Sequence, residues 1–348
     1  MTRALRAVFA LATTLALGLT AACTSSAQAD RTRTAVTTTT AAAATTTTAR
    51  LAPAGTTYGV GRRDITLVDR SRDTDADAKN HVAAKTGRTL PTVILYPTTD
   101  AADDATGDDH PVAEGRFPLV VFSHGVTASG PAYVGVMKQL VADGYVVALP
   151  TFPLTSGSHG WDNISQTIDQ PADVSFIIGE LLARSAGGDR LLGGHLAPGA
   201  VAIAGHSLGA ITSLLFFNTC CRDERVKAVV AISGITFPGK TEGDSYDDPP
   251  KIPLLLLHGE KDTTLRYDAG SRQIFDETLT PVPRALVSFP DAGHIDVLGS
   301  PSFMPAVVAF LDRELRGDVA AWKRLGAKID ANGDARIEVA GGLPAPTT

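Results

Sequence analysis

Residues 200–217 read AVAIAGHSLGAITSLLFF, and this stretch decides the fold. The apolar run Val201–Ala204 predicts a buried strand, and the small and then bulky residues Ala210–Phe217 predict a buried helix. Between them stands GHSLG, the Gly-x-Ser-x-Gly pattern of a nucleophile elbow. A sharp strand-to-helix turn strains the serine backbone, so the residues two before and two after it must lack bulk. The pattern predicts a nucleophilic Ser207 above a helix N-terminus, where developing negative charge is favoured, rather than an ordinary turn.

Apolar strands alternate with helical segments on both sides of this stretch. Further strands are predicted at Ile65–Val68, Thr92–Tyr96, Phe117–Phe122, Tyr145–Leu149, Val226–Ile232, Ile252–Leu257 and Ala285–Phe289. Helices are predicted at Pro131–Ala142, Pro171–Arg184, Arg266–Leu279 and Phe303–Leu315. The alternation predicts an α/β fold with a mostly parallel, doubly wound sheet, helices on both faces, and an antiparallel pairing of the first two strands. Ligands of such sheets bind outside the carboxyl ends of the strands, where Ser207 lies.

A catalytic serine needs a base, and the base needs an acid that orients it. In this kind of sheet the expected chain order is serine, acid, histidine. Asp262 follows the strand that ends at Leu257, and His294 follows the strand that ends at Phe289. Both residues have the expected order and place, so Ser207, Asp262 and His294 are the predicted triad.

Other residues compete for two of these roles. His159 is the main rival for the base, although it precedes the elbow in the chain. Asp291 and Asp296 are rival acids, but both stand very close to His294 in sequence. The remaining histidines fall in polar loops, inside the elbow, in the loop after Phe122, or before a glycine at a strand end, where a structural role is expected.

Two backbone N–H groups are predicted to form an oxyanion hole, those of Leu208, after the nucleophile, and Val126, after the strand Phe117–Phe122. Such groups stabilise the negative oxygen of a tetrahedral intermediate. The connection Ser233–Lys251 is too short for a helical cap domain, so the site is expected to be open. Its walls are predicted to include Phe152, Trp161, Phe237 and Val297, each of which is equally compatible with ordinary packing.

The N-terminus resembles an export signal. Arg3 and Arg6 precede the apolar run Ala7–Leu19. TAAC at residues 20–23 resembles a bacterial lipobox, which predicts lipidation of Cys23 and attachment to the outer face of the cell membrane. Ordinary secretion is the alternative. The expected division is a signal peptide at 1–23, a disordered Thr/Ala-rich tether at 24–57, a catalytic domain at 58–316 and a C-terminal extension at 317–348.

Composition narrows the partners. The 31 Lys and Arg against 37 Asp and Glu leave a net charge of −6, with no basic block in the body of the chain, which argues against nucleic acid as a partner. Cys220 and Cys221 are adjacent, and either a vicinal disulfide or two packed thiols is compatible with an exported protein. The segment Asp330–Asp334 begins like a calcium loop, but Ala335 and Gly341 break that pattern, so no metal site is expected.

Three segments together resemble the α/β-hydrolase superfamily over Tyr58–Arg316. They are GRTLPTVILYP at 87–97, FPLVVFSHGVTASGPAYVGVMKQLVADGYVVALP at 117–150 and AIAGHSLGAITSLL at 202–215. Within the superfamily they are similar to bacterial relatives of platelet-activating-factor acetylhydrolases, chlorophyllases and polyester hydrolases of the cutinase type. The resemblance implies a Ser-Asp-His carboxylic ester hydrolase, an esterase or lipase that needs no cofactor, with small-molecule, lipid or polymeric esters as substrates. A peptidase or amidase of the same fold and a non-catalytic surface-binding lipoprotein are the alternatives.

Overall fold

The computed structural model describes residues 51–99, 105–106, 110–237 and 243–347, which belong to a compact unit spanning Thr48–Thr348. The predicted signal peptide, Cys23 and the tether up to residue 50 lie outside the described residues. Residues 51–57, expected in the tether, contact the domain, because the Ala52 N–H donates to the carbonyl of Arg116 at 2.8 Å. No helix among the described residues is long and apolar enough to cross a membrane.

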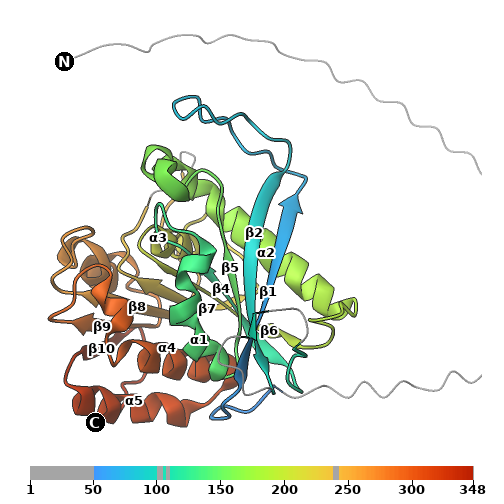
Figure 1. Ribbon diagram of the computed structural model, residues 1–348. Helices are drawn as coiled ribbons and strands as arrows, with labels where there is room; N and C mark the ends of the chain where they lie inside the picture. Colours follow the sequence, from blue (N-terminus) through green and yellow to red (C-terminus); the bar gives the residue numbers. More distant parts are fainter. Residues whose placement is uncertain (1–50, 100–104, 107–109, 238–242, 348) are drawn as a thin grey trace, which may run out of the picture. The chain divides into compact units, whose positions relative to one another are not determined.

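The described strands form one sheet of ten, in the order β10-β9-β8-β7-β6-β4-β5-β2-β1-β3 (Figure 1). Strands β4 to β9 are mutually parallel, whereas β2 pairs antiparallel with β1 and β5, and β10 pairs antiparallel with β9. The predicted mostly parallel sheet is therefore confirmed. The strands are β1 (Gly59–Asp69), β2 (Arg88–Thr98), β3 (Ala105–Thr106), β4 (Phe117–Ser123), β5 (Val146–Pro150), β6 (Leu196–His206), β7 (Val226–Ile232), β8 (Leu254–Gly259), β9 (Arg284–Phe289) and β10 (Arg336–Ala340).

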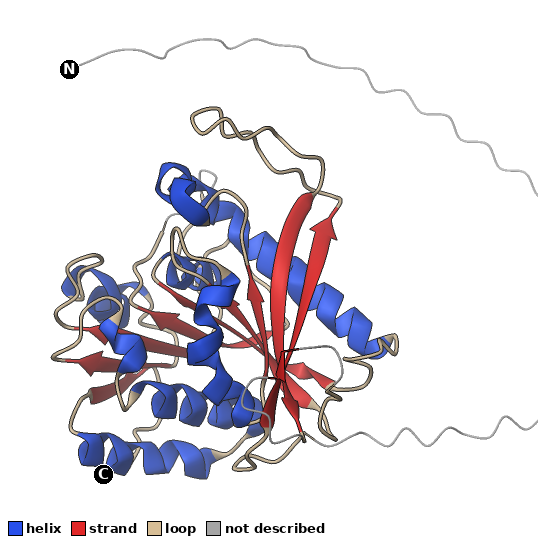
Figure 2. Cartoon of the chain, in the orientation of Figure 1, coloured by secondary structure: helices blue, strands red, loops and turns tan. Residues whose placement is uncertain are grey.

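Helices cover both faces of the sheet (Figure 2). Side chains of α1, α4 and α5 pack on one face, and those of α2, α3 and η5 pack on the other. The α-helices are α1 (Val134–Ala142), α2 (Gln170–Ala186), α3 (Leu208–Leu214), α4 (Phe303–Leu311) and α5 (Val319–Asn332). Shorter 3-10 or π-helical segments are η1 (Gly130–Tyr133), η2 (Gly157–Asp169), η3 (Leu215–Phe217), η4 (Asp268–Arg272), η5 (Ile274–Thr278), η6 (Asp296–Gly299) and η7 (Asp312–Arg316).

The central strands are continuous apolar runs because helices bury them from both sides. Every residue of β4, β5, β8 and β9 is buried. Because β4 to β9 are parallel, the carboxyl ends of β4, β6, β8 and β9 lie at one edge of the sheet. The loops that leave these ends hold the predicted site residues.

The C-terminal segment 317–348, expected as an extension, is continuous with the domain. Trp322 of α5 is fully buried and donates through its indole N–H to the carbonyl of Pro344 at 2.7 Å. Strand β10 then adds to the free edge of β9. Asp334, in the calcium-like stretch, accepts a hydrogen bond from the Ser302 N–H at 3.0 Å, so this carboxylate joins α4 to the turn after α5.

Candidate active site

The elbow has the backbone strain that its sequence predicts. Ser207 has φ 58° and ψ −119°, a conformation that L-residues avoid unless the surroundings impose it. A Cβ at Gly205 would lie 2.1 Å from the carbonyl oxygen of Gly209, and one at Gly209 would lie 2.0 Å from that of Ser123. Both glycines are therefore required, and the second lets the start of α3 touch the end of β4.

The acid and the base of the predicted triad meet at the sheet edge. The Nδ1–H of His294 donates to Oδ2 of Asp262 at 2.6 Å, although 32 residues separate them. Asp262 is buried, while the His294 side chain keeps 13% of its surface exposed. With Nδ1 protonated, the neutral ring presents an unprotonated Nε2, the tautomer that can accept a proton from a serine.

Four donors hold the Asp262 carboxylate. Oδ2 faces His294 and also the Nε2 of His258 at 3.0 Å, and Oδ1 accepts from the N–H groups of Thr264 and Leu265 at 2.8 and 2.9 Å. Burial alone would raise the pKa of Asp262, but the hydrogen bonds from His294, Leu265 and Thr264 hold it below its usual 3.8. The carboxylate is therefore charged at neutral pH and fixed in orientation.

His258 is a second histidine on the triad acid. Its Nε2 also lies 2.8 Å from the carbonyl of Leu265, and since both neighbours are acceptors, this nitrogen carries the proton. Its Nδ1 then accepts from the Ser271 hydroxyl at 2.8 Å. Burial lowers the pKa of His258, so the ring is neutral and orients Asp262 without adding charge.

The loop that follows β4 and contains Val126, which we call the oxyanion loop, lies against the elbow. A Cβ at Gly125 would stand 3.3 Å from the Ser207 Cβ, which places the neighbouring Val126 beside the nucleophile. Thr127, at φ 64°, donates to the Thr155 carbonyl at 2.8 Å and accepts from the Gly157 N–H at 3.0 Å, and these bonds anchor the loop. Within the part of the chain that the structure describes, the Val126 N–H forms no hydrogen bond.

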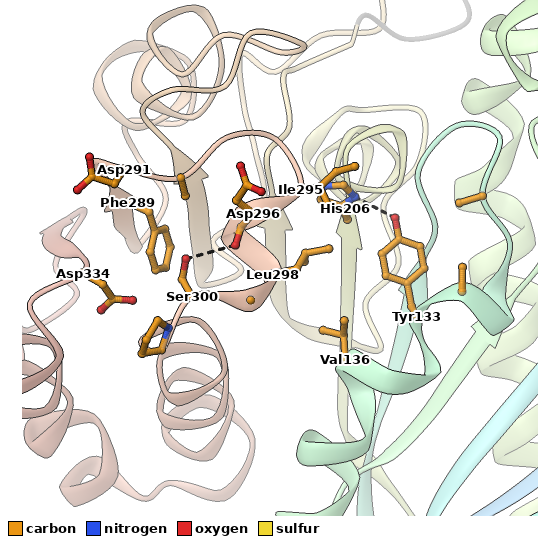
Figure 3. A pocket seen from close by; sticks show the side chains of 15 residues that line it. Tyr133, Val136, His206, Phe289, Asp291, Ile295, Asp296, Leu298, Ser300 and Asp334 are labelled. Atoms are coloured by element: carbon orange, nitrogen blue, oxygen red, sulfur yellow. Dashed lines mark hydrogen bonds between the residues drawn. The ribbon is translucent and has the colours of Figure 1, made fainter.

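Tyr133 and His206 join the three parts of the site. The Tyr133 hydroxyl accepts from the Gly125 N–H at 3.1 Å and donates to Nδ1 of His206 at 2.9 Å (Figure 3). The Nε2–H of His206 donates to the carbonyl of His294 at 2.9 Å, and the two rings lie 4.9 Å apart. The chain of bonds therefore ties the oxyanion loop, the elbow and the loop of the base together. The sequence identified neither Tyr133 nor His206 as functional, since nothing in the local pattern marks them.

Two buried histidines, His206 and His124, which directly follows β4, are expected to make the free energy of unfolding depend on pH. Burial lowers the pKa of both His124 and His206 to about 4, whereas an unfolded chain protonates histidine below ~6.5. The stabilisation is complete above that unfolded pKa and is lost as pH falls towards 4, by ~3 kcal/mol per ring. We expect urea titrations between pH 7 and pH 4.5 to show this fall, and His124→Asn to flatten the slope by up to one proton. A free energy of unfolding that stays constant from pH 7 to pH 5 would contradict the assignment.

The predicted wall residues divide into two groups. Phe152 and Val297 are fully buried and belong to the core, so the expectation that they line the site is wrong: each follows a strand end but points into the protein. Trp161 is 59% exposed on η2, and Phe237 is half-buried. The side chain of His159 lies outside the described residues. Cys220 and Cys221 form a disulfide on a turn after η3.

A cavity of about 810 Å³ lies next to the loop that carries His294 (Figure 3): its lining includes Ile295 and His206, but not Ser207, Asp262 or His294 themselves. Tyr133 and Val136 form one wall, Ile295 and Leu298 contribute to the other, and His206 stands at the inner end. Among the described residues of the connection 233–253 there is no helix or strand above the site. The expected absence of a large cap domain agrees with this arrangement.

Two stretches of the chain match known protein families. Residues 82–159 match the family model described as platelet-activating factor acetylhydrolase, isoform II, and residues 196–295 match the model described as serine hydrolase (FSH1). None of the curated proteins compared with the chain matches it. Among the solved structures, the ferulic acid esterase from Streptomyces cinnamoneus matches with a TM-score of 0.58 and 18% identity over 77% of this chain and 94% of that one. The chain therefore has the α/β fold of that esterase, and two of its segments are similar to these two hydrolase families.

Proposed function

We propose that the protein hydrolyses carboxylic esters through Ser207, His294 and Asp262. The observation that carries the proposal is the 2.6 Å hydrogen bond between His294 and Asp262 at the strand edge where the strained Ser207 stands. Acyl transfer requires a correctly placed nucleophile, a base that can accept its proton and a donor for the negative oxygen. The strained Ser207, the tautomer of His294 and the Val126 N–H, which has no hydrogen-bond partner among the described residues, support these three roles. The partial matches to hydrolase families support an ester as the substrate.

The reaction follows from the geometry in two halves. Ser207 Oγ attacks the ester carbonyl carbon while Nε2 of His294 takes the hydroxyl proton, and the N–H groups of Val126 and Leu208 stabilise the negative oxygen. His294 then gives that proton to the leaving alkoxide, which departs as the alcohol and leaves an acyl-serine. In the second half, His294 deprotonates a water that attacks the acyl carbon; the bond to Ser207 Oγ then breaks, His294 returns the proton to that oxygen, and the acid is released.

A labelling experiment tests the proposal directly. A fluorophosphonate probe should react once per chain and modify the peptide that contains Ser207, because only an activated serine displaces fluoride from such a reagent. The same preparation should hydrolyse p-nitrophenyl acetate and leave a p-nitroanilide peptide intact. Labelling elsewhere, or anilide cleavage at the rate of ester cleavage, would refute the proposal and favour the amidase alternative in the second case.

We also propose, from the sequence of residues 1–23, that the protein is exported and held at the membrane through lipid on Cys23. An anchored, uncapped site suits bulky or external esters. Cys23→Ala should move the protein from the membrane fraction to the medium or periplasm; equal distribution of parent and variant would count against the anchor.

A further inference from the structure

The cavity beside His206 has a definite position relative to the reacting atoms. The His206 ring lies 4.9 Å from the His294 ring, and Ile295, which directly follows His294, is part of the cavity lining. The oxyanion donors Val126 and Leu208 are not part of that lining. Ala128 and Tyr133, which follow Val126 in the chain, line the opposite wall, so the cavity adjoins the loop of the base and extends to the segment after the oxyanion loop.

This position distinguishes the two halves of an ester. His294 must protonate the leaving oxygen, so the alcohol part of the substrate has to lie on the side of the base when the carbonyl oxygen occupies the oxyanion hole. The acyl part then points away from His294. A cavity that adjoins the base is accordingly placed for the alcohol part.

The chemistry of the lining selects what the cavity can hold. Most of its lining side chains are apolar, with Ala128, Ala132, Val136, Ile295, Leu298 and Pro301 among them. Asp291 and Asp334 lie at the end away from Tyr133 (Figure 3), and Asp296 lies between. Lys261 pairs with Asp291 at 2.6 Å, and Arg336 also acts on the Asp291 carboxylate, but neither cation belongs to the lining.

No cationic side chain stands among the described lining residues, and burial lowers the pKa of His206 to about 4, so this ring is neutral at pH 7. An anionic group in this cavity would meet the carboxylates of Asp291, Asp296 and Asp334 but no cationic side chain of the lining, so its desolvation would not be offset. The volume is within the usual range of ~300–1,000 Å³ for small-molecule sites. An apolar, uncharged group is the ligand that fits these walls.

Resting on the proposed ester hydrolysis, we propose that this cavity binds the alcohol part of the substrate, and that it takes an apolar, uncharged alcohol such as an aryl or branched alkyl group. The acyl part occupies a different region. Which esters are accepted is therefore decided mainly by the alcohol part in this cavity and by whether that part carries a charge.

Two ester series test the assignment. One keeps acetate and varies the alcohol from ethyl to 2-naphthyl; the other keeps ethanol and varies the acid from acetate to octanoate. Val136→Phe fills the cavity from a partly exposed position on α1, and Val319→Phe makes the same change at an exposed position outside the lining. We expect Val136→Phe to lower kcat/KM for 2-naphthyl acetate by about tenfold or more, and to leave ethyl acetate and the acyl series within about twofold. Val319→Phe should change neither series.

Retained turnover of ethyl acetate shows that Val136→Phe has folded. If Val136→Phe lowered kcat/KM only for ethyl octanoate, the cavity would belong to the acyl part and the proposal would be overturned. The proposal would also be overturned if Val136→Phe changed kcat/KM in neither series.

Binding to Ser207→Ala gives a readout that does not need turnover. This variant should bind 2-naphthol, and adding Val136→Phe should weaken binding about tenfold; 6-hydroxy-2-naphthalenesulfonate should bind at least about tenfold more weakly than 2-naphthol. Equal binding of the sulfonate, or of naphthol to the filled cavity, would contradict the inference. If the parent cleaves no ester while naphthol binding still depends on Val136, the proposed function and the assignment to an ester alcohol both fail, and only the preference of the cavity for an apolar, uncharged ligand stands.

Discussion

Ser207→Ala is expected to lower kcat for ester hydrolysis by about 10⁶-fold, because the acyl-enzyme route needs the serine oxygen and no neighbouring group replaces it. Alanine fits the elbow, since the strained φ of 58° is imposed by Gly205, Gly209 and the strand end rather than by the hydroxyl. The remaining rate should reflect the oxyanion hole and binding alone, ~10³-fold or more above the uncatalysed reaction. Steady-state kinetics with p-nitrophenyl acetate measures the loss.

Ser213→Ala is the matched control. Ser213 lies on the same helix, is buried, and spends its hydroxyl on the carbonyl of Gly209 at 3.0 Å. The same change there should leave kcat within about threefold, because that bond contributes only ~1 kcal/mol. If Ser207→Ala kept a tenth of the activity, or if Ser213→Ala lost as much, the assignment of the nucleophile would have to be abandoned.

The parts of the site that the sequence predicted are those encoded locally. The elbow is a contiguous pattern, and the need for Gly205 is explained by a contact across a single turn, 2.1 Å from a Gly205 Cβ to the Gly209 oxygen. Asp262 and His294 each follow an apolar run that had to be a buried strand, and parallel strands bring their carboxyl ends to one edge. Order along the chain and strand ends were therefore enough to bring together residues 32 positions apart.

The parts that were missed depend on contacts between distant segments. Tyr133 bonds His206 across 73 residues, and no periodicity reports that a hydroxyl will meet an imidazole. His258 resembled a structural histidine before a glycine, and only the turn that folds Asp262 back shows that the two share a bond. Phe152 was expected on the wall or, equally, in ordinary packing, and the structure buries it fully, which only the tertiary packing could decide. Strand β10 was missed because edge pairing leaves a short, half-exposed run.

Asp262→Asn is expected to lower kcat/KM by about 10⁴-fold, the typical cost of placing an amide behind a triad histidine. An amide nitrogen at the Oδ2 position would face the Nδ1 of His294 and force its proton to Nε2. In that tautomer His294 cannot accept the proton of Ser207. Rates of the variant and the parent enzyme should be compared at one constant pH.

This chain gives asparagine no acceptable orientation, because all four neighbours of the carboxylate are donors. If the amide nitrogen takes the Oδ2 position it opposes the N–H groups of His294 and His258; in the other orientation it opposes those of Thr264 and Leu265. Unlike a substitution that only changes a tautomer, Asp262→Asn should therefore also lower the free energy of unfolding by ~2 kcal/mol or more, since buried donors lose their partner. Asp268→Asn, at a side chain 61% exposed in the same region of sequence, is the control and should change neither quantity appreciably. A variant that lost activity with unchanged stability would show that the second histidine does not bind the acid, and one that kept activity would remove Asp262 from the triad.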